Sequence, residues 1–158
     1  MSETAVVITI STRAAAGMYE DKSGPIIAAA LDDLGLEVSG PVIVPDGDAV
    51  GVALRDAVVA GHAVVITTGG TGLNPNDHTP EQTRSVVDRE IPQLAAAIAR
   101  YGADHGVPTA VLSRGVAGVA DRTLIINLPG SSGGARDGMA VVGPLLRHAV
   151  SQIRGGDH

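Results

Sequence analysis

The sequence contains no cysteine, no phenylalanine and no tryptophan, and only two tyrosines. The lack of cysteine excludes disulfide bonds, thiolate metal sites and a cysteine nucleophile. The scarcity of aromatic side chains removes the stacking surfaces on which single-stranded nucleic acids bind. The formal net charge of −6 argues against a basic surface that neutralises a phosphate backbone. We therefore expect no nucleic-acid partner, and we expect anionic ligands to be held by local groups.

Long apolar runs are missing as well. No run reaches the roughly 20 residues of a membrane-spanning helix, so we expect no membrane partner. The first ten residues have no basic segment ahead of their apolar stretch, so the sequence predicts no signal peptide and a cytoplasmic location. A length of 158 residues fits one domain, which we expect over residues 1–154, with 155–158 as a flexible tail.

Apolar residues make up 44% of the chain, and most are valine, isoleucine, leucine and alanine. Continuous runs of such residues are typical of parallel strands buried on both faces. They predict strands over 5–10, 37–44, 62–68, 109–112 and 123–128. Segments with helical spacing of apolar residues separate them, at 25–34, 50–58, 79–91, 94–98 and 134–153. This alternation predicts a three-layer α/β/α fold with a mainly parallel central sheet.

Polar loops follow three of the predicted strands, over residues 11–24, 69–79 and 129–134. In open α/β sheets, ligands bind beyond the carboxyl ends of the strands. The strongest motif there is Thr67-Thr-Gly-Gly-Thr-Gly72, whose backbone N–H groups are suited to hold anionic oxygens. It lacks the lysine of a Walker loop and the third glycine of a dinucleotide-binding loop. A flexible turn is the alternative interpretation.

Two aspartates stand near these loops. Asp77 follows the glycine loop and is a candidate Mg²⁺ ligand, because Mg²⁺ prefers one or two carboxylates together with phosphate oxygens. Asp77 fits equally well as a cap of the helix that begins at Pro80, although Thr79 is the better cap candidate. Asp46 is a second candidate metal or substrate carboxylate, whereas Asp48 fits a helix cap.

Two further positions are candidates for binding an anion. Ser23 lies at the start of the first predicted helix, where backbone N–H groups attract anions, and a plain capping role fits as well. Arg114 is placed to clamp a phosphate, although an arginine in a loop is more often solvated.

Together these segments resemble the molybdopterin adenylyltransferase family of Mog/MoaB-like proteins, and most of all its actinobacterial Mog form. The resemblance covers nearly the whole chain and rests on motifs in a common order: Ser11-Thr-Arg13 with Gly17, Asp21-Lys-Ser-Gly-Pro25, Pro45-Asp46, Thr68-Gly-Gly-Thr-Gly72, Asp77 with Thr79-Pro-Glu81, Asp88-Arg-Glu90, Ser113-Arg114, Gly118 and Asn127-Leu-Pro-Gly-Ser131.

The resemblance implies a three-layer α/β protein, usually trimeric, that binds molybdopterin and ATP with Mg²⁺. It implies adenylyl transfer to molybdopterin with release of pyrophosphate, and hand-over of the product to a molybdenum insertase. Asp46 and Asp77 match the family's catalytic and metal-binding aspartates. The matching substrate-binding positions are Ser11, Arg13, Ser23, Thr68, Gly69, Gly70, Thr71, Gly72, Ser113, Arg114, Pro129, Gly130 and Ser131.

Three positions depart from the family pattern. Asn76 stands where an arginine is usual, Thr12 where an aspartate is usual, and Gln93 where a glycine is frequent. The missing arginine removes one cation from an anionic site. A non-catalytic relative that binds molybdopterin or a partner protein is therefore the alternative, and from the fold alone so is a general nucleotide- or phosphate-binding module.

Overall fold

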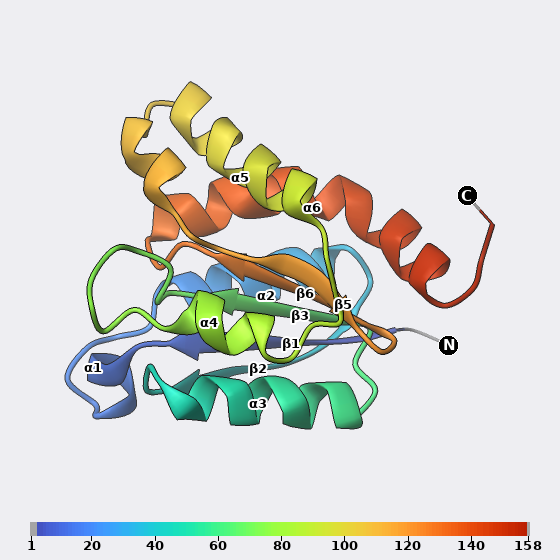
Figure 1. Cartoon of the computed structure of the whole chain (residues 1–158), viewed down its shortest axis with the longest axis horizontal. Helices are drawn as coiled ribbons and strands as arrows, with labels where there is room; N and C mark the ends of the chain where they lie inside the picture. The colour runs from blue at the N-terminus through green and yellow to red at the C-terminus, as the bar shows by residue number, and fades with distance from the viewer. Residues whose placement is uncertain (1–2, 158) are drawn as a thin grey trace.

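The computed structural model describes residues 3–157, and its centre is a six-stranded sheet of order β2-β1-β3-β6-β5-β4 (Figure 1). β2, β1, β3 and β6 are parallel, whereas β5 and β4 add to one edge in antiparallel orientation. The bounds of the strands are β1 Thr4–Ile10, β2 Glu37–Val44, β3 Val64–Thr68, β4 Arg89–Glu90, β5 Ala117–Ala120 and β6 Thr123–Leu128.

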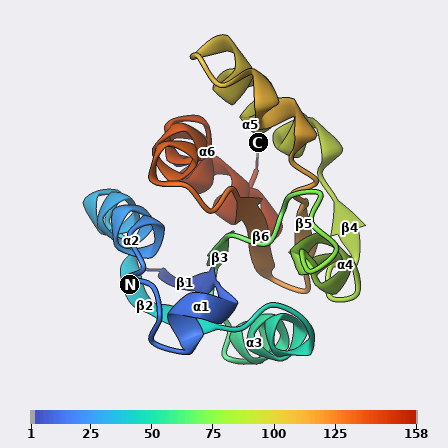
Figure 2. The same cartoon turned by 90° about the vertical axis from the view of Figure 1, so that its left-hand side faces the viewer.

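Helices cover both faces of this sheet. The α2, α5 and α6 helices lie on one side, and α3 and α4 lie on the other (Figures 1 and 2). Their bounds, with those of the short α1 and the 3₁₀ helix η1, are α1 Thr12–Ala15, α2 Ser23–Asp33, α3 Asp48–Val59, α4 Thr79–Arg84, α5 Pro92–Asp104, η1 Pro108–Leu112 and α6 Ser132–Ile153. The predicted three-layer α/β/α fold with a mainly parallel sheet is confirmed.

The strand β1 shows why its sequence is apolar throughout. Ala5 and Val7 pack in the core beneath α2 and α6, whereas Val6, Ile8 and Ile10 pack in the core beneath α3. Alternate side chains of a strand point to opposite faces, so a strand covered on both faces needs an apolar residue at every position. Small branched side chains fill both cores without any aromatic ring.

Two predicted elements were wrong. The expected strand over 109–112 is the 3₁₀ helix η1, which begins at Pro108. Proline has no N–H to donate to a sheet and its φ suits a first helical turn. The helix expected over 79–91 ends at Arg84, because Arg89 and Glu90 pair with β5. β5 was not predicted, since it consists of small residues without a long apolar run.

Helix ends also differ from the prediction. The α2 helix begins at Ser23 instead of Pro25, and the Asp21 carboxylate accepts the N–H of Gly24 at 3.0 Å. Asp48 is the first residue of α3, and Gly47 occupies the cap position, so the cap assigned to Asp48 was wrong.

At the C-terminal end of the chain, Gly155 donates its N–H to the carbonyl of Gln152. Met1, Ser2 and His158, which the predicted domain and tail include, lie outside the described residues. Within residues 3–157, none of the helices has the length and apolar character needed to cross a membrane.

Glycines in α6 give a test of the packing. A Cβ atom on Gly138 would lie 2.6 Å from the Leu128 side chain, which is fully buried, whereas a Cβ on Gly143 would meet Leu34 at an ordinary 3.6 Å. We expect Gly143→Ala to raise the free energy of unfolding by up to about 1 kcal/mol through helix propensity. The free energy of unfolding of Gly138→Ala should be lower than that of Gly143→Ala by about 1–3 kcal/mol, because the added methyl group overpacks the core. Urea unfolding of both variants measures the difference, and equal stabilities would contradict this packing.

Candidate functional site

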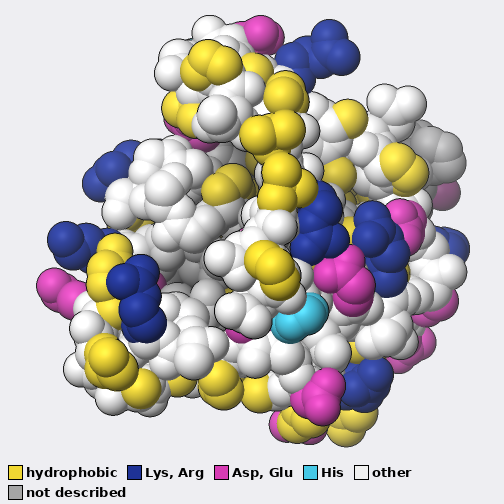
Figure 3. Space-filling view, turned by 60° about the vertical axis from the view of Figure 1, so that its left-hand side comes forward, with side chains coloured by type: hydrophobic (Ala, Val, Ile, Leu, Met, Phe, Trp, Pro, Cys, Tyr) yellow, Lys and Arg dark blue, Asp and Glu magenta, His cyan; other side chains and the backbone are white. Residues whose placement is uncertain are grey.

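The carboxyl ends of β1, β3 and β6 bring three loops to one edge of the sheet (Figure 2). These loops follow Ile10, Thr68 and Leu128, and they are the loops in which the sequence places its candidate residues. The space-filling view of this face shows a hollowed middle of backbone and small polar side chains (Figure 3). Lys and Arg side chains lie on both sides of this hollow, and a His lies with Asp or Glu side chains on one of them.

The glycine loop, Gly69–Gly72, packs tightly against its neighbours. Gly69 and Gly70 have φ angles of 99° and 70°, a region that favours glycine. A Cβ on Gly69 would meet the carbonyl oxygen of Ile10, and a Cβ on Gly70 would lie 2.6 Å from Oδ2 of Asp46. Both glycines are therefore required by the contact between loops, independently of any ligand.

Thr79 anchors the glycine loop from below. Its buried hydroxyl donates to the carbonyl of Gly69 at 3.0 Å, and its N–H donates to the carbonyl of Gly70 at 3.2 Å. The cap position of α4 belongs to His78, and no side chain caps that helix. The predicted cap roles of Thr79 and Asp77 were therefore wrong, and Thr79 ties α4 to the loop instead.

Thr68 joins the other two loops. Its buried hydroxyl lies 2.9 Å from the Ser23 hydroxyl and 2.8 Å from the carbonyl of Pro129. A hydroxyl has one proton, so the arrangement requires Ser23 to donate to Thr68 and Thr68 to donate to Pro129. Gly130 follows so closely that its Cβ would lie 3.2 Å from Cα of Gly69. These contacts hold the start of α2, the end of β3 and the last loop together.

A hollow of about 420 Å³, which we call the anion hollow, lies between these loops. The starts of α2 and α6 both border it, and helix N-termini attract anions. Arg13 and Lys22 add two positive charges to its lining. Its main lining residues are Ser11, Arg13, Asp21, Lys22, Ser23, Thr68, Gly69, Gly130, Ser131 and Ser132.

Other groups in the anion hollow are held by the protein. Asp21 accepts the Thr9 hydroxyl at 2.8 Å through one oxygen and the N–H of Gly24 at 3.0 Å through the other, so both of its oxygens are bonded to the protein. The Ser131 hydroxyl accepts the N–H of Gly134 at 3.0 Å and caps α6. The guanidinium carbon of Arg13 lies 4.9 Å from the centre of the Tyr19 ring. The groups that line the hollow are therefore held in place by contacts within the protein.

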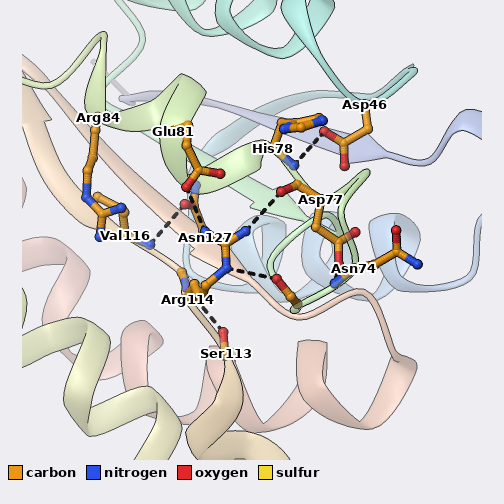
Figure 4. Close-up of polar contacts among 12 residues, drawn as sticks. Asp46, Asn74, Asp77, His78, Glu81, Arg84, Ser113, Arg114, Val116 and Asn127 are labelled. Atoms are coloured by element: carbon orange, nitrogen blue, oxygen red, sulfur yellow. Dashed lines mark hydrogen bonds and ion pairs between the residues drawn. The ribbon is translucent and has the colours of Figure 1, made fainter.

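Asp46 and Asp77 border the glycine loop at two different glycines (Figure 4). Oδ1 of Asp46 accepts the N–H groups of Gly47 at 2.7 Å and His78 at 3.0 Å, and its Oδ2 faces Gly70. Oδ2 of Asp77 accepts the N–H of Asn74 at 3.2 Å and lies 2.9 Å from the Cβ position of Gly72. Each carboxylate keeps acceptor capacity beyond these bonds.

Within residues 3–157, no group of three or more His, Cys, Asp or Glu side chains is close enough to hold a metal ion. The donor set nevertheless fits Mg²⁺, which usually keeps waters and binds through one or two carboxylates plus substrate phosphates. Asp46 and Asp77 are the two carboxylates beside the glycine cradle.

Arg114 ties the loop after the glycines to α4 (Figure 4). Its Nε and Nη2 atoms donate to the carbonyls of Gly72 and Asp77, both at 2.9 Å, and Nη1 donates to Glu81 at 2.6 Å. The hydrogen bond to Glu81 raises the pKa of Arg114, and the same bond lowers the pKa of the Glu81 carboxyl. Arg114 was predicted as a phosphate clamp, and these bonds commit three of its donors to the protein.

Two contributors to the site were not among the predicted site residues, namely Glu81 and Asn127. Asn127 is buried, donates to the hydroxyls of Thr67 and Thr83 at 3.0 Å, and accepts the N–H of Val116 at 2.9 Å. Its signal was a polar amide at an inward position of an apolar strand. Such a residue must find partners, because a buried amide without them is costly.

Known proteins are similar to this chain in sequence and in fold. Residues 6–148 match the family model described as a probable molybdopterin binding domain. The Mog protein of Mycobacterium ulcerans is 54% identical, with a TM-score of 0.89 over 96% of this chain and 99% of that chain. The chain belongs to the Mog/MoaB family. Among curated relatives, the molybdopterin adenylyltransferase of Pyrococcus furiosus is 34% identical over 94% of this chain and 89% of its own.

A Mog/MoaB domain also occurs inside longer proteins. The molybdenum cofactor biosynthesis bifunctional protein of Synechococcus elongatus is 37% identical over 98% of this chain. This chain spans 48% of that relative's length.

The Glu81–Arg114 pair of this Mog/MoaB chain gives a pH-dependent test. The pKa of Glu81 is lowered in the folded state, so the pair stabilises the fold above the ordinary pKa of 4.5 and loses this contribution as pH falls through the lowered value. Glu81→Gln should therefore unfold at a lower urea concentration than wild type at pH 7. The loss in the free energy of unfolding should be less than about 1 kcal/mol, because the pair is exposed. The difference from wild type should shrink as the pH falls below 4.5 and through the lowered pKa of Glu81. Glu37→Gln, at an exposed position in β2, is the control, and a deficit in Glu81→Gln that does not shrink as the pH falls would contradict the ionic role.

Proposed function

We propose that this protein is a molybdopterin adenylyltransferase that acts in molybdenum cofactor biosynthesis. It transfers AMP from ATP to the terminal phosphate of molybdopterin and releases pyrophosphate. The observation that carries the proposal is the anion hollow, in which two helix N-termini, Arg13 and Lys22 converge in a protein of net charge −6. The names of relatives such as the Pyrococcus furiosus protein support it.

The reaction joins two polyanions. An oxygen of the molybdopterin phosphate attacks the α-phosphorus of ATP, a new P–O bond forms, and the bond between the α-phosphorus and the bridging oxygen breaks. Pyrophosphate takes the electron pair of that bond. Such transfers depend mainly on positioning and on neutralising charge, and they need no covalent help from the protein.

The residues of the site divide this work. The anion hollow is the place for one phosphate group, held by backbone N–H groups at the starts of α2 and α6 and by Arg13 and Lys22. Asp46 and Asp77 would hold a Mg²⁺ ion that arrives with ATP, and this ion would neutralise phosphate charge. Arg114 and Thr79 keep the glycine loop in place between them.

The departures from the family pattern are compatible with catalysis. Thr12, which replaces the usual aspartate, accepts the N–H of Asp46 at 3.2 Å and so helps to position it. Asn76, which replaces the usual arginine, lines a hollow of about 690 Å³ with Asp46 and His78. A non-catalytic relative that binds molybdopterin or a partner protein is the alternative that these two positions allow. Formation of adenylyl-molybdopterin from molybdopterin, ATP and Mg²⁺ by the purified protein distinguishes the two.

Asp77 provides the sharper test of the chemistry. Asp77→Asn keeps an oxygen that can accept the N–H of Asn74 but removes the charge. The rate of adenylyl transfer should fall by roughly 10²-fold or more, the scale for one preorganised electrostatic contact. The melting temperature should stay within a few degrees of wild type, because Asp77 is a half-buried loop residue and asparagine keeps the one hydrogen bond that its carboxylate accepts. Asp46→Asn should behave similarly, with a larger effect on substrate affinity.

The matched control is Asp33→Asn at the exposed end of α2, which should leave both rate and stability unchanged. An Asp77→Asn protein that is destabilised but fully active would remove Asp77 from the chemistry. A wild-type protein that binds molybdopterin but forms no adenylylated product would favour the non-catalytic alternative.

We also propose that the protein forms a symmetric trimer in the cytoplasm and hands its product to a molybdenum insertase. A direct hand-over would protect the reactive phosphoanhydride from water. Exposed apolar side chains at Leu73, Val111 and Leu112 are available for contact with another copy. Light scattering should give a mass of three chains at micromolar concentration, and a monomer throughout this range would contradict the trimer.

A further inference from the structure

A pocket of about 480 Å³ lies at the end of the sheet opposite the candidate functional site. It opens between α2 and α6, beside the amino end of β1, and we call it the α2/α6 pocket. The candidate site lies at the carboxyl ends of the strands, so the two spaces are at opposite edges of the sheet (Figure 1). The residues that line the pocket are Glu3, Leu34, Gly35, Leu36, Gly143, Leu146, Arg147, Val150 and Ser151.

The floor of the α2/α6 pocket is apolar. Leu146 and Val150 lie one turn apart on α6, belong to the core, and are 4% and 8% exposed. Leu34, at the end of α2, forms a wall and remains 42% exposed. A Cβ atom on Gly143 would lie 3.6 Å from the Leu34 side chain, so the glycine leaves the space between the two helices open. Small-molecule sites typically have this size, with apolar walls and few polar groups.

Two charged side chains, Glu3 and Arg147, line the α2/α6 pocket. Oε2 of Glu3 lies 3.5 Å from Nη1 of Arg154, and Nη2 of Arg154 donates to the carbonyl of Gly61 at 3.2 Å. Among residues 3–157, no ion pair or hydrogen bond holds the guanidinium of Arg147. Because the charges of Glu3 and Arg154 offset each other, the charge that remains for a ligand is the positive charge of Arg147.

Ser151 places a hydroxyl group near this guanidinium. It follows Arg147 by four residues on α6, so the two side chains lie on the same face of the helix. A guanidinium donates hydrogen bonds in a planar fork that matches the two oxygens of a carboxylate, and a hydroxyl can donate one more. A ligand that suits both the apolar floor and these donors therefore carries a carboxylate on an apolar body.

We propose that the α2/α6 pocket is a second ligand site, separate from the site of the proposed adenylyl transfer, and that it binds a small monocarboxylate with an apolar chain. The chain lies over Leu146 and Val150, and the carboxylate pairs with Arg147. An ammonium group in place of the carboxylate is repelled by the guanidinium. The α6 helix begins at the anion hollow and ends beside this pocket, so one helix borders both sites.

Octanoate and octylammonium, which share an apolar chain and differ in the sign of their charge, test the proposal on the wild-type protein. Titration calorimetry gives their affinities, and the backbone amide signals in NMR spectra give the place of binding. Octanoate should bind roughly 10-fold or more tightly than octylammonium, the scale of a charge-assisted hydrogen bond. It should shift the signals of residues 34–36 and 143–151. No binding of octanoate at millimolar concentration, equal binding of the two ions, or shifts confined to other residues would each overturn the proposal.

Two variants test the parts of the α2/α6 pocket. Arg147→Gln removes the charge at an exposed position and should weaken octanoate binding roughly 10-fold. Arg100→Gln, at an exposed position on α5, is the matched control and should bind as wild type does. Gly143→Leu fills the space beside Leu34 and should abolish binding. Full affinity in Arg147→Gln, or in a folded Gly143→Leu protein, would contradict the site, and the Arg147→Gln result does not depend on how Gly143→Leu folds.

Pyrophosphate separates this pocket from the anion hollow. It should leave the octanoate titration unchanged, because the two spaces lie at opposite ends of α6. Displacement of octanoate by pyrophosphate would place the carboxylate in the anion hollow and overturn the proposal. The titrations contain neither molybdopterin nor ATP, so octanoate binding by a protein that forms no adenylylated product supports the pocket and removes only the proposed reaction. Adenylyl transfer by a protein that does not bind octanoate removes only the pocket.

Discussion

The close approach of Gly69 to the carbonyl of Ile10 is the constraint on which the site depends. It leaves no room for a side chain between the ends of β1 and β3, which are parallel neighbours and therefore bring the loops that follow them to one edge. The Thr79 hydroxyl, from α4, donates to the carbonyl of Gly69, and the Thr68 hydroxyl, from β3, donates to the carbonyl of Pro129. Because these groups are buried, their hydrogen bonds fix the loop geometry before any ligand arrives.

In a protein of net charge −6, the proposed binding of polyanions relies on backbone dipoles as well as on side-chain cations. The anion hollow lies where α2 and α6 both begin, so two sets of N–H groups face the same space. Arg13 and Lys22 add charge at that point. Arg114, in contrast, supports the loop between Gly72 and Asp77 through three of its donors. An arginine near a phosphate site can therefore act by positioning the backbone.

A second hollow, of about 390 Å³, extends the same edge of the sheet in the direction of α5 and η1. At least one glycine that lines it is also required by the packing, since a Cβ on Gly134 would lie 2.7 Å from the Pro129 side chain. The anion hollow and this second hollow thus share the start of α6. Ser131 holds that start through its bond to Gly134, so the two parts are positioned by one helix cap.

The sequence by itself determined the layers of the fold and the edge at which the site lies. Continuous apolar runs such as 123–128 require burial on both faces, and the alternation with helices favours parallel strands, so the polar loops after these strands meet at one edge. Only the tertiary structure decided that Thr79 anchors the glycine loop, that Asn127 joins β6 to α4, and that Asp137 lines the second hollow. It also decided that residues 108–112 form η1. These outcomes depend on partners far along the chain. The residues next to a hydroxyl or a carboxylate in the sequence do not determine which distant group that side chain will meet in the folded protein.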